Sequence, residues 1–134
     1  MELLFGTSST TDNFAVIQQA RAGVARGKVD EVSRLTGLTD KDMARILNIS
    51  ERTLHRLRPE ALLDNNASER LLLLESLLQH GLVVFDGRAD VLGRWLRIPL
   101  TELQGQAPLT LLDTATGLGM VHTVLGRIEH GIYA

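Results

Sequence analysis

The stretch that decides the fold is TDKDMARILNISERTLHRLRP, Thr39 to Pro59. Two short helices that cross steeply need a small residue on the first helix and a turn residue that tolerates positive φ. Ala44 and Asn48 supply these two features four residues apart, and Ser50 can cap the second helix. Apolar residues on both sides of the turn can fill a shared core: Met43, Leu47, Ile49, Leu54 and Leu57. The spacing therefore predicts a helix-turn-helix.

The outward face of the second predicted helix is polar and basic. Arg52 and Arg56 share one side of this helix because they are four residues apart. The arginine fork suits phosphate groups and the acceptor edge of guanine. We therefore predict that this face binds DNA through Ser50, Arg52, Thr53, His55 and Arg56. An ordinary helical hairpin with a solvated charged face is the alternative interpretation.

The charge around this motif is small. Five basic residues against four acidic ones between positions 39 and 60 leave about one positive charge. Glu51 lies on the same helix and would repel phosphate or accept a hydrogen bond from cytosine. Tight DNA binding would therefore need a homodimer, which reads two half-sites, or a further partner.

The composition favours an all-α protein. The 134 residues are enough for one domain or two very small ones, and 44% of them are hydrophobic. Only 4% are aromatic, and the chain is rich in leucine, which favours helices over strands. The formal net charge of -2 argues against DNA binding by bulk positive charge. The absence of cysteine excludes disulfides, thiolate metal sites and cysteine nucleophiles.

Cap and stop residues divide the rest of the chain into helices. Before the motif, we expect one helix capped by Asp12 or Asn13 and another over about 28–36. After it, Ser68 is the predicted cap of a leucine-rich helix over 69–80 that ends at Gly81. The run over 82–85 fits either a short strand or the start of a helix. Further helices are expected over 86–97 and from Thr114 or Thr116 to Gly131. We place a domain boundary between 1–66, the DNA-binding half, and 67–134.

The sequence contains no convincing catalytic or metal-binding pattern. The histidines are His55, His80, His122 and His130, and no two of them form a zinc signature. No paired carboxylates, nucleophile with a base, or lysine-bearing phosphate loop is present. We therefore predict no enzymatic activity, no cofactor and no bound metal.

Gly126 is the unusual residue of the last predicted helix. Inside a helix a glycine costs about 1 kcal/mol relative to alanine, so it often marks the close approach of another backbone. That backbone can belong to the same chain or to a partner protein, and the sequence leaves both possibilities open.

The C-terminal quarter carries a family resemblance. PLTLLDTATGLGMVHTVLGRIEHGIY, Pro108 to Tyr133, resembles the terminal signature of the Xre/MbcA/ParS-type antitoxins, with its LLDT and LGRIEHG segments. VFDGRADVLGRWLRIPL, Val84 to Leu100, is similar to the segment of that family that ends in a Trp-Leu pair and a proline. NISERTLHR resembles the family's Xre-like helix-turn-helix. The resemblance covers roughly residues 14–133.

The resemblance implies a type II antitoxin. Such a protein would bind a RES-domain toxin encoded beside it, which degrades NAD, and would cover the NAD pocket without itself binding NAD. It would also regulate its own operon as a DNA-binding repressor. The last helix would plug the toxin's cleft, and the residues that we expect to line or border this contact are His122, Gly126, Arg127, Glu129, His130 and Tyr133.

Two alternatives remain at this point. One is a stand-alone repressor with a C-terminal dimerisation or ligand domain, and the other is a small enzyme. Met1 is not followed by a basic region and a long apolar stretch, and no apolar run approaches the roughly 18 residues of a membrane span. We therefore expect a cytoplasmic protein with no membrane partner.

Overall fold

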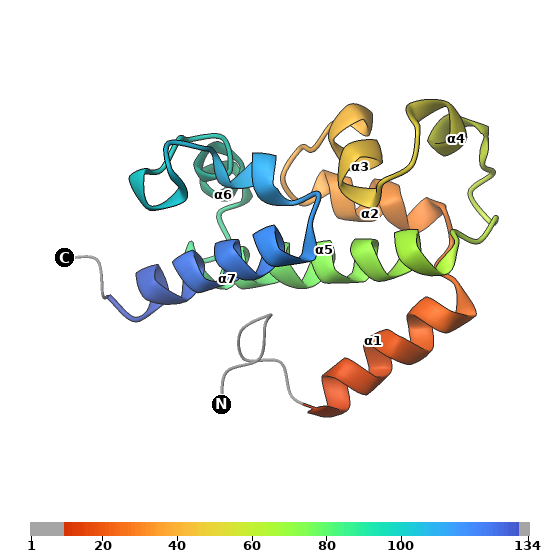
Figure 1. Ribbon diagram of the computed structural model, residues 1–134, viewed down its shortest axis with the longest axis horizontal. Coiled ribbons are helices and arrows are strands. Elements are labelled where there is room, and N and C mark those ends of the chain that lie inside the picture. Colours follow the sequence, from red (N-terminus) through yellow and green to blue (C-terminus); the bar gives the residue numbers. More distant parts are fainter. Residues whose placement is uncertain (1–9, 132–134) are drawn as a thin grey trace.

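The computed structural model describes residues 10–131 and confirms the all-α class, since these residues form helices and no strand (Figure 1). Within this range, no helix is both long enough and apolar enough to cross a membrane. The α-helices are α1 (Thr10–Ala22), α2 (Gly27–Arg34), α3 (Asp40–Leu47), α4 (Glu51–Arg56), α5 (Asn65–Val84), α6 (Ala89–Trp95) and α7 (Ala115–Glu129), with short 3-10 helices at Thr101–Leu103 and Pro108–Leu111.

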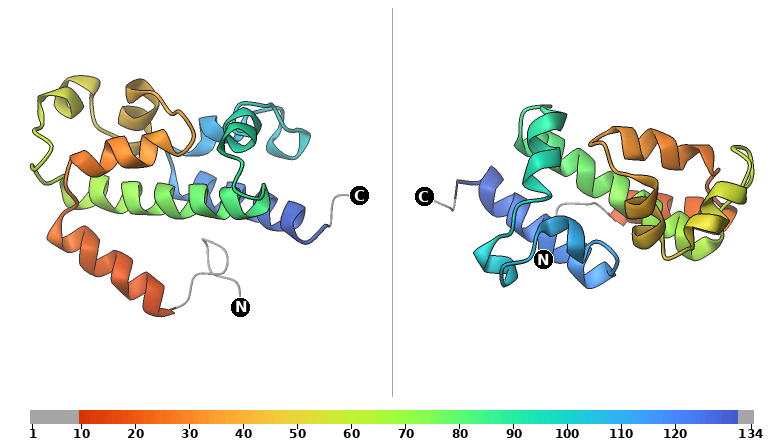
Figure 2. Two further views of the ribbon diagram at one scale, coloured as in Figure 1. Left: turned by 180° about the vertical axis from the view of Figure 1, so that it is seen from behind. Right: turned by 90° about the horizontal axis from the view of Figure 1, so that it is seen from above.

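The long helix α5 is the centre of the fold. Elements from both ends of the chain pack on it: α1, α2, α3, α6 and α7. In Figures 1 and 2, α5 and α7 run side by side, with α1 on one side of them and α3, α4 and α6 on the other. The buried leucines of α5 join one continuous apolar core with Met43, Leu54, Leu92 and Leu118. The predicted boundary between 66 and 67 falls in the first turn of α5 and stays a prediction.

The start of α5 differs from the sequence prediction. Asp64 caps the helix, because its Oδ1 accepts a hydrogen bond from the Ala67 amide at 2.8 Å. The prediction that Ser68 is the cap was wrong. Ser68 is fully buried inside the helix, where its hydroxyl accepts from the Val24 amide at 2.9 Å and donates to the Leu63 carbonyl at 3.2 Å. Its hydroxyl therefore fixes the segment that enters α2.

The end of α5 also differs, because Gly81 does not stop the helix. The helix continues to Val84, so residues 82–84 are helical, Phe85 is the C-cap, and the run over 82–85 is not a strand. A Cβ atom at Gly81 would lie 2.6 Å from Leu92 Cδ1. The glycine is thus needed for the close packing of α5 against α6.

Helix α6 starts later than predicted, and α7 starts after one of its two predicted caps. Asp86 and Gly87 both have positive φ and form a turn, so α6 covers only part of the expected helix over 86–97. Thr114, and not Thr116, caps α7 by accepting from the Gly117 amide at 2.9 Å. A Cβ at Gly117 would overlap the Leu111 carbonyl, which explains this glycine by packing.

Two arginines join the N-terminal helices to the C-terminal half through backbone carbonyls. Arg45 of α3 donates to the Leu109 carbonyl at 2.7 Å. Arg70 of α5 donates to the Ile46 carbonyl at 3.3 Å and the Asp113 carbonyl at 2.6 Å. These contacts hold α3 against the segment that leads into α7.

Candidate functional site

The helix-turn-helix forms as the sequence predicts, from α3 and α4. Thr39 and Asp42 make a complete reciprocal capping box at the start of α3, with hydrogen bonds of 3.0 and 3.1 Å. Asn48 ends α3 in the left-handed conformation, with φ 58°, and the Ile49 amide donates to the Ala44 carbonyl at 3.0 Å. The turn geometry follows from these local bonds, and Ala44 is buried at the crossing.

The structure places the five predicted DNA-binding residues on the exposed face of α4 and its cap. Leu54, on the opposite face, is fully buried and anchors the helix. Ser50 serves as the cap, because its hydroxyl accepts from the Thr53 amide at 2.9 Å. His55 Nε2 lies 3.0 Å from Asp40 Oδ2, a contact that links α4 to the start of α3.

Arg52 and Arg56 are the available cations of this face. Both side chains are exposed, and neither makes an ion pair with any residue in the described range. An exposed arginine without a carboxylate partner keeps its full set of donors for a phosphate or a base edge. The arrangement of this face is therefore suited to DNA, and the roles of the individual residues stay predictions.

The sequence analysis did not identify Arg26, whose side chain holds α4 by a hydrogen bond to its backbone. Arg26 is only 9% exposed, and its Nε donates to the Leu54 carbonyl at 2.8 Å. This carbonyl is in the last turn of α4, where the helix itself offers no partner. Asp30 lies 3.4 Å from Arg26 Nη1 and offsets part of the cost of burying the charge. No local pattern in the sequence marks this arginine, because its partner is 28 residues away.

The second predicted surface is the C-terminal end of α7. Arg127 and His130 are exposed, and Gly126 is half-exposed. A Cβ at Gly126 would meet nothing within 4 Å, so close packing within the described part of this chain does not explain the glycine. Tyr133 lies outside the described residues. The structure thus leaves the partner-protein interpretation of Gly126 open.

His122 lies behind this surface, where it belongs to a polar cluster between α5 and α7. It is 3% exposed, and its ring stacks on His80 of α5 with a centroid distance of 5.2 Å. The two Nδ1 atoms are 3.0 Å apart, and His80 Nε2 is 3.1 Å from Glu129 Oε1. The cluster therefore connects the last turn of α7 to the core through His80.

The Glu129 carboxylate determines the direction of one hydrogen bond in this cluster. The Glu129 carboxylate can only accept, so His80 Nε2 donates the hydrogen bond between them. The second hydrogen bond of the cluster joins the Nδ1 atoms of His80 and His122. Burial, the larger cause, and the neighbouring His80 together lower the pKa of His122 from 6.5 to about 4. His122 is thus neutral at physiological pH.

Within residues 10–131, no group of three His, Asp or Glu side chains is arranged to hold a metal ion. What the geometry offers is two binding surfaces: the basic face of α4 and the end of α7.

The comparisons with known proteins assign each half. Residues 15–75 match the model of the antitoxin Xre-like helix-turn-helix domain, and residues 80–131 match that of the antitoxin Xre/MbcA/ParS C-terminal toxin-binding domain. The chain belongs to the Xre/MbcA/ParS family of antitoxins. The antitoxin is therefore a regulatory binding protein and not an enzyme, with a toxin as its protein partner.

Three curated relatives support this assignment. The antitoxin is 29% identical over 105 residues to Antitoxin Xre of Photorhabdus laumondii, an alignment that covers 78% of this chain and 71% of the relative. It is 23% identical over 120 residues to Antitoxin Xre of Yersinia enterocolitica, with coverage of 89% and 81%. It is 30% identical over 136 aligned positions to the Prs ADP-ribosylating antitoxin of Sphingobium sp., with coverage of 95% and 84%. The toxin-binding domain favours the antitoxin over a stand-alone repressor.

Proposed function

We propose that this antitoxin neutralises a RES-domain toxin that consumes NAD, by covering the toxin's active site with the end of α7. The observation that carries the proposal is the open face at Gly126 beside the exposed Arg127, within the domain whose family binds toxins. A helix face without side-chain bulk lets another backbone approach closely. Glu129 is held in place by His80, so the last turn is preorganised for docking.

The chemistry of the toxin can take two forms. The Sphingobium relative is named for ADP-ribosylation, whereas the family resemblance implies NAD degradation. Both reactions break the bond between nicotinamide and ribose, and they differ in whether water or a protein side chain receives the ADP-ribose. An antitoxin that covers the NAD pocket blocks either reaction, so the proposal does not depend on which acceptor is used.

The DNA-binding half would make the antitoxin a repressor of its own operon in the cytoplasm. The exposed, unpaired Arg52 and Arg56 of α4 support this role. Because the basic footprint of the motif is small, we expect a homodimer that reads two half-sites. The predicted direct contacts are Ser50, Arg52, Thr53, His55 and Arg56.

A truncation tests the proposed toxin contact. We expect an antitoxin that lacks residues 127–134 to lose growth rescue when it is co-expressed with the toxin from the adjacent gene, because the end of α7 is gone. In vitro, the full chain should stop NAD consumption by the purified toxin and the truncated chain should not. Arg21→Ala on the exposed side of α1 is the matched control and should rescue fully.

The control for folding is the melting curve of the truncated chain, which should remain cooperative. Growth rescue by a truncated chain that is expressed at the level of the full one would refute the proposed contact.

A further inference from the structure

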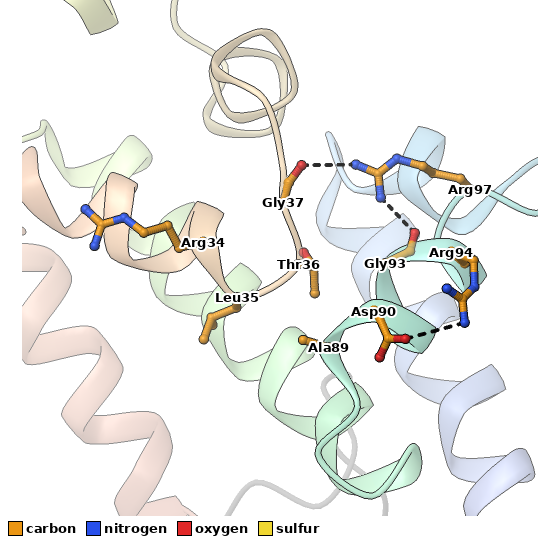
Figure 3. A pocket seen from close by; sticks show the side chains of 9 residues that line it. All are labelled: Arg34, Leu35, Thr36, Gly37, Ala89, Asp90, Gly93, Arg94 and Arg97. Atoms are coloured by element: carbon orange, nitrogen blue, oxygen red, sulfur yellow. Dashed lines mark hydrogen bonds and ion pairs between the residues drawn. The ribbon is translucent and has the colours of Figure 1, made fainter.

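A groove between the two halves of the molecule carries an unassigned positive charge. It is open, has a volume of about 410 Å³, and lies between the end of α2 and helix α6 (Figure 3). Three arginines and one aspartate line it, which leaves a formal charge of +2. We call Arg34, Arg94 and Arg97 the flanking arginines. None of the lining residues belongs to α7, so the groove is separate from the predicted toxin contact.

Arg97 connects this groove to the helix-turn-helix. Its Nη1 donates to the Gly93 carbonyl at 2.7 Å and its Nη2 to the Gly37 carbonyl at 3.4 Å (Figure 3). Asp42 Oδ2, in the first turn of α3, is 4.0 Å from Arg97 Nη2. The guanidinium of Arg97 therefore lies beside the start of α3, the first helix of the motif, although Arg97 follows α6 in the chain.

The other two flanking arginines are weakly paired. Arg94 is 3.6 Å from Asp90, and the same carboxylate is 3.8 Å from Arg88, so one acid serves two bases. Arg34 makes no ion pair with any residue between 10 and 131. Both side chains are exposed, and the guanidinium of Arg34 points away from α6 in Figure 3. The groove is therefore bordered by separate exposed cations and is not a closed pocket for one small anion.

The position of these cations indicates their ligand. In a helix-turn-helix complex the second helix enters the major groove while the first helix crosses the DNA backbone. Figure 1 shows α6 on the same side of the molecule as α3 and α4. A DNA backbone that crosses α3 thus passes close to Arg97. Arginines that contact phosphates supply affinity without reading sequence.

We propose that the flanking arginines contact the phosphate backbone of the DNA next to the base pairs that α4 reads. This inference rests on the proposed DNA binding of the antitoxin. It means that α6, part of the domain matched as toxin-binding, also contributes to operator affinity. It also accounts for how a motif with about one net positive charge can hold DNA.

The test is the salt dependence of DNA binding by the antitoxin, alone and with its toxin, measured by fluorescence anisotropy. The probes are a duplex from the region upstream of the antitoxin gene and an unrelated duplex of the same length. We expect Arg94→Gln to lower the slope of log K against log salt by about 1, and Arg34→Gln with Arg94→Gln by about 2. Both duplexes should be weakened equally, so the preference for the upstream duplex is retained.

Arg21→Gln is the matched control, because it removes the same charge from α1, the helix that lies on the opposite side of α5 and α7 from α6 in Figure 1. A slope for Arg94→Gln equal to that for Arg21→Gln overturns the inference. Weaker toxin capture by Arg94→Gln with an unchanged slope also overturns it and assigns the arginines to an acidic toxin surface. Failure of the unsubstituted antitoxin and its complex to prefer the upstream duplex refutes the repressor role itself.

Discussion

The helix-turn-helix and the end of α7 are both exposed binding surfaces, but they are held in place in different ways. Thr39, Asn48 and Ser50 fix the ends of α3 and α4 through bonds to residues at most five positions away. The last turn of α7 is held by His80, which is 42 residues from His122 and 49 from Glu129. The ends of α3 and α4 are therefore set by local caps, with Arg26 as a long-range support of α4, whereas the last turn of α7 depends on contacts between distant parts of the chain. Substitutions in the two regions should have correspondingly different effects.

The largest effect should come from breaking the close packing of α5 against α6, in the half of the chain that also carries α7. Gly81→Val would drive a side chain into Leu92, and we expect the free energy of unfolding to fall by about 3 kcal/mol. Urea denaturation measures this loss. Gly126→Val is the matched control, because a Cβ there meets nothing within 4 Å. It should leave stability nearly unchanged and should still weaken toxin capture. An equal loss in the two variants would contradict the packing argument.

The second-largest effect should be a loss of folding stability at acid pH, caused by His122 of the histidine cluster. The pKa of His122 is about 4 in the folded chain and near 6.5 in the unfolded chain, so only the unfolded chain binds the proton at pH 5. Stability is therefore full above pH 6.5 and is lost as the pH falls toward 4. Between pH 7.5 and 5 we expect roughly 2 kcal/mol of loss from this group.

His122→Gln is the comparison for that measurement, and its readout is the slope of stability against pH. The variant should show a smaller slope over the same pH range, whatever its absolute stability. Identical slopes for the two proteins would assign the acid sensitivity to other groups.

The smallest effect should come from the local caps. Thr39→Ala removes the hydroxyl that accepts the Asp42 amide and should cost about 1 kcal/mol. DNA binding should weaken by a similar amount, because the start of α3 frays, while toxin capture stays unchanged. A thermal melt and the two binding assays separate these outcomes. Equal losses in DNA and toxin binding would show that the helix-turn-helix and the end of α7 do not keep their structures independently of each other.

The same difference explains how much of the structure could be predicted from the sequence. The motif at 39–57 was predictable because caps, turn residue and apolar spacing are all local. The cap of α5 was not, since Asp64 and Ser68 are both good cap residues. What decides between them is the Val24 amide, 44 residues away, which uses the Ser68 hydroxyl.

For the candidate surfaces too, local features could be predicted from the sequence and contacts between distant residues could not. The exposed side of α4 follows from helical spacing around Leu54, so its five polar residues could be chosen in advance. His122 is one of the residues that the resemblance predicts at the toxin contact, yet the structure buries it against His80. Arg26 and Arg97 act through backbone carbonyls of distant segments, and no spacing rule identifies such partners.

The single core around α5 has a consequence for the lifetime of the protein in a cell. Proteases cut chains that are unfolded, and residues from both halves lose their packing together when this core opens. One unfolding event would therefore expose the DNA-reading helix and the toxin-covering helix to degradation at once. Under the proposed function, derepression of the operon and release of the toxin would then be simultaneous. The unfolding rate of the single helical core would set the rate of both.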